Sequence, residues 1–219
     1  KIPTIEQLNL PPVLKNISMF NRGIVIVTGP TGSGKSTTMA AMINYVNNNR
    51  EAHIITIEDP IEFTHQSLKC LVDHREVGRH TTSFPAALKA ALREDPDIVL
   101  VGEMRDLETI SLAMTAAETG VLVFGTLHTN SAAKTIDRII DVFPAKQQEQ
   151  ARSQLAQGLK AIIAQQLLKT ADGTGRVAVN EILICNTGIS NLIRENRTGQ
   201  ISSFIQMGKE EGMQSMDVA

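Results

Sequence analysis

One segment of the chain carries residues whose types and spacing suit the binding of phosphate groups. Residues 29–37 read Gly-Pro-Thr-Gly-Ser-Gly-Lys-Ser-Thr and fit the phosphate-loop pattern G-x-x-x-x-G-K-[ST]. The glycines let the backbone approach a polyphosphate, so main-chain N–H groups and the start of the next helix can bind the anion. In this pattern Lys35 reaches the β- and γ-phosphates and Ser36 binds Mg²⁺. The sequence therefore predicts binding of ATP and Mg²⁺, and the predicted ATP-binding residues are Gly29, Pro30, Thr31, Gly32, Ser33, Gly34, Lys35, Ser36 and Thr37.

Carboxylate side chains follow two other apolar runs, and open α/β sheets bind ligands at the carboxyl ends of their strands. The run over residues 52–58 ends in Glu58-Asp59-Pro60-Ile61-Glu62, and the run over 98–101 ends in Gly102-Glu103. Glu103 is the candidate that orients or deprotonates the attacking water, because phosphoryl transfer depends on positioning. Glu62 is the candidate for a second catalytic carboxylate and for holding the water shell of the metal.

A third apolar run, over residues 121–127, ends at His128, which could contact the γ-phosphate. A single histidine is also commonly a structural residue, and both interpretations stay open. His128 is therefore a third catalytic candidate beside Glu103 and Glu62.

The rest of the sequence predicts the elements that must position these residues. Apolar runs over 23–28, 52–58, 98–101 and 121–127 predict buried strands, and a further strand is expected over 177–185. Apolar residues at helical spacing predict helices over 37–46, 84–94, 106–120, 132–140, 147–168, 189–195 and 200–209. Ser83 and Asp106 are the expected N-caps of two of them. Strands joined by helical crossovers predict an α/β fold, with a mainly parallel RecA-like sheet flanked by helices.

Composition limits the classes of function. The net charge of −2 and an aromatic content of 3% argue against a nucleic-acid motor, which needs basic loops or stacking platforms. The two cysteines, Cys70 and Cys185, stand far apart, so no zinc site is expected. No apolar run reaches membrane-spanning length, so we expect a cytoplasmic protein without a transmembrane segment.

Four ordered motifs give the chain a resemblance to secretion-superfamily ATPases that runs nearly end to end. Residues 56–62 resemble the Asp box of that superfamily, residues 92–106 its Walker B segment, and residues 125–129 its His box. A fourth motif resembles the signature of one branch, the type IV pilus retraction ATPases. The signature residues are Asn191, Leu192, Ile193, Arg194 and Glu195.

The resemblance implies roles for individual residues. Lys35 and Ser36 match the Walker A lysine and magnesium residue, and Glu62 matches the Asp-box glutamate. Glu103 matches the catalytic Walker B glutamate, and His128 the second His-box histidine. In this family arginines also reach the nucleotide. Here the possible contributors are Arg93, Arg105 and Arg138.

The resemblance also implies an assembly. The family members are homo-hexameric motors that use ATP hydrolysis to disassemble pili, which drives twitching motility. They work at the inner membrane through a pilus platform protein, so a cytoplasmic location with peripheral membrane association is expected. Residues 1–21, which hold Pro3, Pro11 and Pro12, are expected to be a linker that follows a PAS-like domain. Residues 22–186 would form the ATPase core, and 187–219 a helical C-terminal region that is cut short and ends without a closing element.

Two positions depart from the family pattern, and other functions stay open. Val121 replaces the first His-box histidine, and Ser190 replaces an arginine of the retraction signature. The alternatives are a pilus-extension or type II secretion ATPase, a RecA-like nucleic-acid motor, and a nucleotide-binding subunit without turnover. The extension and secretion enzymes typically carry four zinc-binding cysteines, and the presence of Glu103 argues against the last alternative.

Overall fold

The computed structural model describes residues 1–218, and its strands form a seven-stranded sheet in the order β3-β2-β4-β5-β1-β6-β7. The strands are β1 (Gly23–Thr28), β2 (His53–Glu58), β3 (Leu71–Glu76), β4 (Ile98–Val101), β5 (Leu122–Leu127), β6 (Leu159–Lys169) and β7 (Arg176–Ile184). The α-helices are α1 (Val13–Ser18), α2 (Lys35–Asn49), α3 (Phe84–Leu92), α4 (Leu107–Glu118), α5 (Ala132–Asp141), α6 (Gln148–Gly158), α7 (Thr187–Arg194) and α8 (Ile201–Met207). The chain divides into two compact units, the first formed by Lys1–Val25 and Ser36–Thr126, the second by Ile26–Lys35 and Leu127–Ala219.

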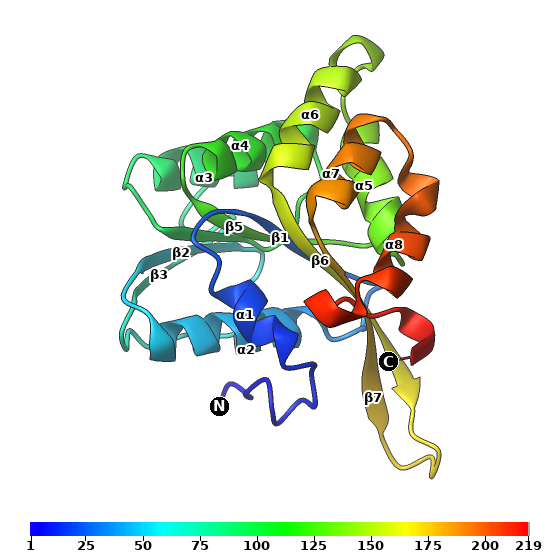
Figure 1. Ribbon diagram of the computed structural model, residues 1–219. Coiled ribbons are helices and arrows are strands. Elements are labelled where there is room, and N and C mark those ends of the chain that lie inside the picture. The colour runs from blue at the N-terminus through cyan, green and yellow to red at the C-terminus, as the bar shows by residue number, and fades with distance from the viewer. Residues whose placement is uncertain (219) are drawn as a thin grey trace. The chain divides into compact units, whose positions relative to one another are not determined.

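The first unit is built on parallel strands with helices on both faces. β2 pairs in parallel with β3 and with β4, and β4 pairs in parallel with β5. In Figure 1, α3 and α4 lie on one face of these strands and α1 and α2 on the other. Because both faces are covered, β2, β4 and β5 are largely apolar, and Ile54, Ile55 and Ile57 of β2 are fully buried. The predicted N-caps hold, since Ser83 and Asp106 accept backbone N–H groups at the starts of α3 and α4.

A short helix, α1, lies where the sequence suggested only a linker. Pro12 stands at the N-cap of α1, a position that needs no N–H donor, so the double proline precedes the helix and does not break it. Leu14 and Ile17 on α1 are fully buried within the first unit. The segment before β1 is therefore anchored to the first unit through these two buried side chains.

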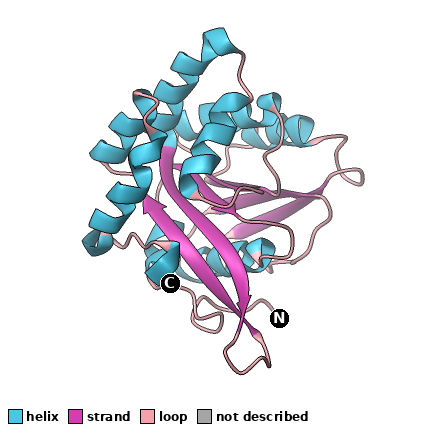
Figure 2. Ribbon diagram, turned by 90° about the vertical axis from the view of Figure 1, so that its right-hand side faces the viewer, coloured by secondary structure: helices cyan, strands magenta, loops and turns pink. Residues whose placement is uncertain are grey.

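The second unit is organised around an antiparallel hairpin. Nine residue pairs join β6 to β7, from Ala161 opposite Ile184 to Lys169 opposite Arg176. Figure 2 shows these two long strands side by side, with a turn at their far end. α6 packs against α7, and α5 contacts both strands of the hairpin.

The predicted helix over 147–168 is wrong, because α6 ends at Gly158 and the chain continues as β6. Residues 161–165 are all buried, so the apolar side chains cover both faces and fit a buried strand as well as a helical stripe. The hydrogen-bonded partner β7, which sequence periodicity does not reveal, decides between the two structures. All the other predicted strands and helices are present, with shifted ends, and the mainly parallel α/β fold is confirmed.

The C-terminal segment was expected to trail away, and that expectation is also wrong. Gln214 pairs through both backbone groups with Ile182 of β7, at 2.8 and 3.1 Å. A short 3-10 turn, Met216–Val218, follows, and Ala219 lies outside the described residues. Across residues 1–218, no helix combines the length and the apolar character needed to cross a bilayer.

Candidate nucleotide-binding site

The phosphate loop joins β1 to α2 and is held in a conformation that requires glycine. Gly32 and Gly34 have φ angles of +81° and +85°, in the left-handed region that other residues rarely adopt. A Cβ atom on Gly29 would lie 2.4 Å from the carbonyl oxygen of Gln165, and one on Gly34 would lie 2.9 Å from its Nε2. The loop is thus pressed closely against β6, and its Ser33 is buried while Pro30, Thr31 and Gly32 are exposed.

Lys35 and His128, which are 93 positions apart in the sequence, are in contact in the second unit. Lys35 Nζ donates a 2.6 Å hydrogen bond to the carbonyl oxygen of Gly29 and lies 2.9 Å from His128 Nδ1. A protonated lysine can only donate, so His128 Nδ1 is the acceptor and the neutral ring carries its proton on Nε2. The ammonium group of Lys35 and the imidazole of His128 therefore lie side by side at the phosphate loop.

Threonine hydroxyls fix the backbone that carries His128. Thr28, the last residue of β1, accepts the N–H of Thr129 at 2.9 Å, and its Oγ1 lies 2.7 Å from Thr129 Oγ1. Thr129 Oγ1 in turn lies 2.5 Å from Thr135 Oγ1 on α5. This chain of hydroxyl contacts sets the position of His128 relative to the loop.

Sequence reasoning missed two residues beneath the loop. Gln165 and Asn180 are each only 2% exposed. Gln165 Nε2 donates to the carbonyl oxygen of Ser33 at 2.6 Å, and Asn180 Nδ2 donates to Gln165 Oε1 at 3.0 Å. Gln165 was missed because residues 147–168 were assigned to a helix, which also left Asn180 without a strand partner. The available signal was a polar side chain that follows an apolar run.

Glu103 lies in the first unit, one residue beyond Gly102 at the end of β4, where the strand was expected to present it. Its Oε2 is 2.6 Å from Arg105 Nη2, and its side chain is 21% exposed whereas that of Arg105 is 69% exposed. Gly102 donates its N–H to the carbonyl oxygen of Ile57 at 2.7 Å, and a Cβ at Gly102 would lie 3.3 Å from the Cα of Glu58. The close approach of the two strand ends gives a physical reason for glycine before Glu103.

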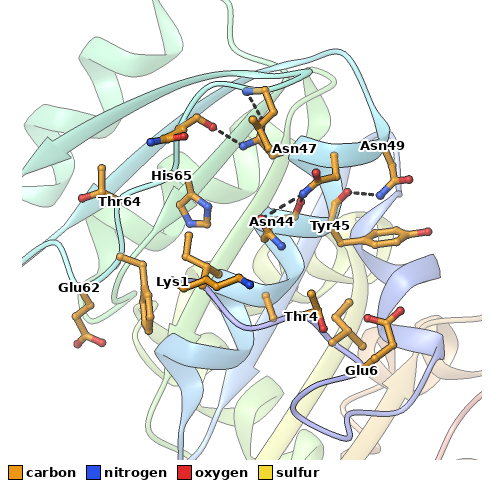
Figure 3. A pocket seen from close by; sticks show the side chains of 17 residues that line it. Lys1, Thr4, Glu6, Asn44, Tyr45, Asn47, Asn49, Glu62, Thr64 and His65 are labelled. Carbon is orange, nitrogen blue, oxygen red and sulfur yellow. Dashed lines mark hydrogen bonds between the residues drawn. The ribbon is translucent and has the colours of Figure 1, made fainter.

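Ser36 and Glu62, the two residues predicted to bind the metal ion, line different cavities of the first unit. Ser36 borders a small cavity of about 30 Å³ together with Glu58 and Gly102. Glu62 is exposed and borders a larger cavity of about 990 Å³, beside Thr64 and the N-terminal residues (Figure 3). The acidic residue that shares a cavity with Ser36 is therefore Glu58.

The donors at this cavity fit a magnesium ion. Mg²⁺ takes oxygen ligands and keeps several waters, so it needs few protein groups beside the phosphates of a nucleotide. Ser36 and Glu58 supply a hydroxyl and a carboxylate, while no cluster of three or more His, Cys, Asp or Glu side chains within residues 1–218 is placed to hold a metal ion.

Two histidines pack behind Glu58. The backbone N–H of His65 donates to His74 Nε2 at 3.0 Å, and His74 Nδ1 lies 2.8 Å from Thr56 Oγ1 and 3.9 Å from Glu58 Oε2. Glu58 raises the pKa of His74, whereas burial lowers the pKa of His65 to about 4. The rings stack with centroids 5.8 Å apart, which fixes the segment leading from β2 to β3.

The remaining predicted residues lie on the surfaces of helices and their ends. Arg93 follows α3 and Arg138 is on α5, and both are exposed. In the signature on α7, Leu192 and Ile193 are buried, while the others are exposed. The outward-facing signature residues are Asn191, Arg194 and Glu195.

The two departures from the family pattern lie at covered positions. Val121 precedes β5 and is 8% exposed. Ser190 is half-buried and donates to the carbonyl oxygen of Ala156 at 3.0 Å. The Ser190 hydroxyl thus joins α7 to α6.

The sequence and the fold of this chain are similar to those of known proteins. The profile of a family described as type II/IV secretion system protein matches residues 9–216. A twitching motility protein of Neisseria gonorrhoeae is 63% identical over 98% of this chain and 57% of its own length. The type IV pilus retraction ATPase PilT of Pseudomonas aeruginosa is 60% identical over all of this chain and 63% of its own length. A crystal structure of the pilus retraction motor PilT with bound ADP matches with a TM-score of 0.91 and 56% identity, over 94% of this chain and 60% of that one. The chain thus spans about three fifths of the relatives it matches.

Proposed function

The chain belongs to the type II/IV secretion system protein family, and we propose that it is the ATP-hydrolysing part of a type IV pilus retraction motor. The observation that carries the proposal is the phosphate loop, where Lys35 Nζ lies 2.6 Å from the Gly29 carbonyl oxygen and 2.9 Å from His128 Nδ1. The ADP in a related structure supports the same ligand class. The reaction would convert ATP and water to ADP and phosphate.

We assign the binding roles as follows. The N–H groups of the loop and the start of α2 bind the phosphates, and Lys35 exchanges its bond with Gly29 for one with the β- and γ-phosphates. Ser36 holds the magnesium ion, with Glu58 or Glu62 beside its waters. When bound, Mg²⁺ supplies positive charge to the phosphate oxygens.

The chemical step is assigned to Glu103. A carboxylate there orients the attacking water and accepts its proton, while Lys35 and the Nε2–H of His128 stabilise charge on the transferred phosphoryl group. The ion pair with Arg105 holds the Glu103 side chain in place. Arg105 could also donate to the phosphate, as could Arg93 and Arg138 of a neighbouring chain.

We further propose that the motor is a homo-hexamer that acts on a pilus platform protein at the cytoplasmic face of the inner membrane. The names of the two relatives, one a twitching motility protein and one a retraction ATPase, support this activity. The Ser190 departure lies within a signature whose other polar residues are exposed, so that surface remains available to a partner.

The decisive experiment measures steady-state ATP hydrolysis by the wild type and by Lys35→Ala. Loss of the ammonium group removes charge stabilisation from both the bound and the transition state, so we expect hydrolysis to fall by about 10³-fold with weaker nucleotide binding. Lys146→Ala, at an exposed lysine, is the matched control and should keep the wild-type rate. Hydrolysis at the wild-type rate in Lys35→Ala would end the proposal.

A cellular assay tests the direction of the motor. In a strain without this protein we expect surface pili to accumulate and twitching to stop, and the wild-type gene should restore twitching while Lys35→Ala should not. A strain that loses its pili instead would identify an extension motor.

A further inference from the structure

A buried glutamine lies directly beneath the phosphate loop. Gln165 on β6 contacts the loop at three points. At the first, its Nε2 donates to the Ser33 carbonyl oxygen at 2.6 Å. At the other two, its backbone carbonyl oxygen lies where a Cβ atom of Gly29 would stand, and its side-chain Nε2 lies where a Cβ atom of Gly34 would stand. Gln165 is 2% exposed, so these contacts form in the absence of competing water. A buried amide of this kind is costly unless it is fully hydrogen-bonded.

The contact with Ser33 sets the direction of a neighbouring donor. In a trans peptide the C=O and the following N–H point in opposite directions. Because Gln165 holds the Ser33 carbonyl toward β6, the N–H of Gly34 in the same peptide must point away from β6, toward the open side of the loop. That N–H is one of the donors that a phosphate-binding loop needs.

Asn180 determines which way the Gln165 amide faces. Its Nδ2 donates to Gln165 Oε1 at 3.0 Å, across the register pair that joins β6 to β7. Because Asn180 Nδ2 is a donor, the atom of Gln165 that faces it is the acceptor Oε1, and the Gln165 nitrogen is turned to Ser33. Asn180 is equally buried, at 2% exposed.

We propose that Gln165 is a positioning residue that holds the Ser33–Gly34 peptide in its phosphate-binding orientation, and that Asn180 acts through it. The proposal rests on the proposed function in one respect, that this loop binds a nucleotide. It adds that the affinity for phosphate depends on a buried amide pair in the hairpin, outside the loop and its motif.

The test compares Gln165→Met with Gln166→Met in the full-length protein, with Mg·ADP as the probe in calorimetric titrations at a temperature where every variant is folded. Methionine preserves length and volume but removes the donor. Gln166 is the next residue on β6, points to the opposite face and is half-buried, so it is a matched control. We expect Gln165→Met to weaken Mg·ADP about tenfold, as for one lost hydrogen bond at a buried site, and Gln166→Met to change it less than twofold.

A double variant separates positioning from general stability. Asn180→Ala should weaken Mg·ADP about threefold in the wild type and have no further effect in Gln165→Met, because Asn180 acts only through Gln165. A structural role alone would lower the free energy of unfolding of the variants and leave the dissociation constant unchanged, which would overturn the proposal. If Gln165→Met does not fold, Asn180→Ala carries the test, and an unchanged dissociation constant in it overturns the proposal as well. A wild-type protein that does not bind Mg·ADP would instead refute the proposed function.

Discussion

Glu103 is the residue on which the distinction between a motor and a passive nucleotide-binding subunit depends. Its carboxylate is ion-paired with Arg105 at 2.6 Å, so an amide in its place would keep the size and one hydrogen bond but lose the base. We expect Glu103→Gln to bind ATP normally and to hydrolyse it about 10²-fold more slowly. Single-turnover hydrolysis and equilibrium binding measure the two quantities separately.

Glu118→Gln is the control for this substitution, because Glu118 is exposed at the end of α4. A parallel loss of binding and turnover in Glu103→Gln would mean that Glu103 holds the metal or the fold and is not the base.

His65 makes the stability of the fold depend on pH. Its pKa is lowered by burial from 6.5 to about 4 in the folded chain, so between these values the unfolded chain binds a proton that the folded chain does not. The free energy of unfolding must therefore fall as the pH drops from 6.5 toward 4. We expect His65→Phe, which retains a ring against His74, to reduce the loss between pH 7 and pH 5 by about 1–2 kcal/mol.

Denaturant unfolding at the two pH values checks this prediction. The pKa of His74 is raised by Glu58, so its contribution has the opposite sign and is lost as the pH rises above 6.5. The wild type and His65→Phe both retain His74. The difference between their free energies of unfolding therefore reports the contribution of His65. An unchanged acid limb in His65→Phe would show that His65 is accessible to protons in the folded state.

The sequence predicted Lys35 from the phosphate-loop pattern and His128 from its place after an apolar run, since strand ends collect at one edge of a parallel sheet. It could not identify Gln165, His65 or His74, because their roles depend on burial and on partners from distant segments. Gln165 is 132 positions from the serine that it contacts. A motif contains the residues that touch the ligand, whereas the buried residues that hold the phosphate loop in place come from distant parts of the chain.

At the scale of elements, β6 shows the limit of periodicity. A strand that is covered on both faces has no alternation, and a buried helix segment of the same length has no stripe. The apolar residues of 159–164 are compatible with both until β7 is recognised as their hydrogen-bonding partner. By contrast, Ser83 and Asp106 were identified from sequence as N-caps because capping is a local interaction.

The side chain of Asn47 joins two elements, α2 and the segment that enters β3, and its backbone carbonyl oxygen also accepts the N–H of Lys69 at 3.0 Å. Its Nδ2 donates to the Gln66 carbonyl oxygen at 2.6 Å, and its Oδ1 accepts the N–H groups of Leu68 and Cys70 at 3.1 and 3.2 Å. Asn47 is 1% exposed, so removal of its amide leaves these backbone groups unsatisfied. We expect Asn47→Ala to lower the free energy of unfolding by about 2–4 kcal/mol.

Denaturant unfolding of Asn47→Ala beside Asn49→Ala tests this account. Asn49 lies on the same helix, is exposed and bonds only within α2, so its substitution should cost less than about 0.5 kcal/mol. Equal losses in the two variants would show that water replaces the Asn47 amide.

At the scale of the whole molecule, alternation of strands and helices was enough to predict a mainly parallel α/β fold. It did not predict that β7 is antiparallel, because its partner β6 was assigned to a helix and no hairpin was therefore expected. The position of β7 at the end of the strand order follows from its pairing with β6 and from no local signal.

We predict that hydrolysis depends on assembly. Arg93 and Arg138 are exposed, and an arginine from a neighbouring chain can increase the rate of phosphoryl transfer by about 10³-fold or more. The specific activity should therefore rise at least about tenfold as the protein concentration increases from the monomeric to the oligomeric range. The measurement is hydrolysis per chain at each concentration, with mass from light scattering. A high and constant specific activity from a monomer would exclude a ring mechanism.

The β6–β7 hairpin also determines where the length of this chain can change. Two side chains at neighbouring register positions of the hairpin make contacts with other segments. Gln165 contacts the phosphate loop, and Glu181 accepts the N–H of Ala132 at the start of α5. A residue inserted into β6 before Gln165 would turn the Gln165 side chain to the other face and release its contact with the phosphate loop. The exposed turn over residues 171–175 can lengthen without moving either. Insertions and deletions among relatives should therefore be confined to that turn, and an aligned gap inside 159–169 would mark a protein that has lost its nucleotide.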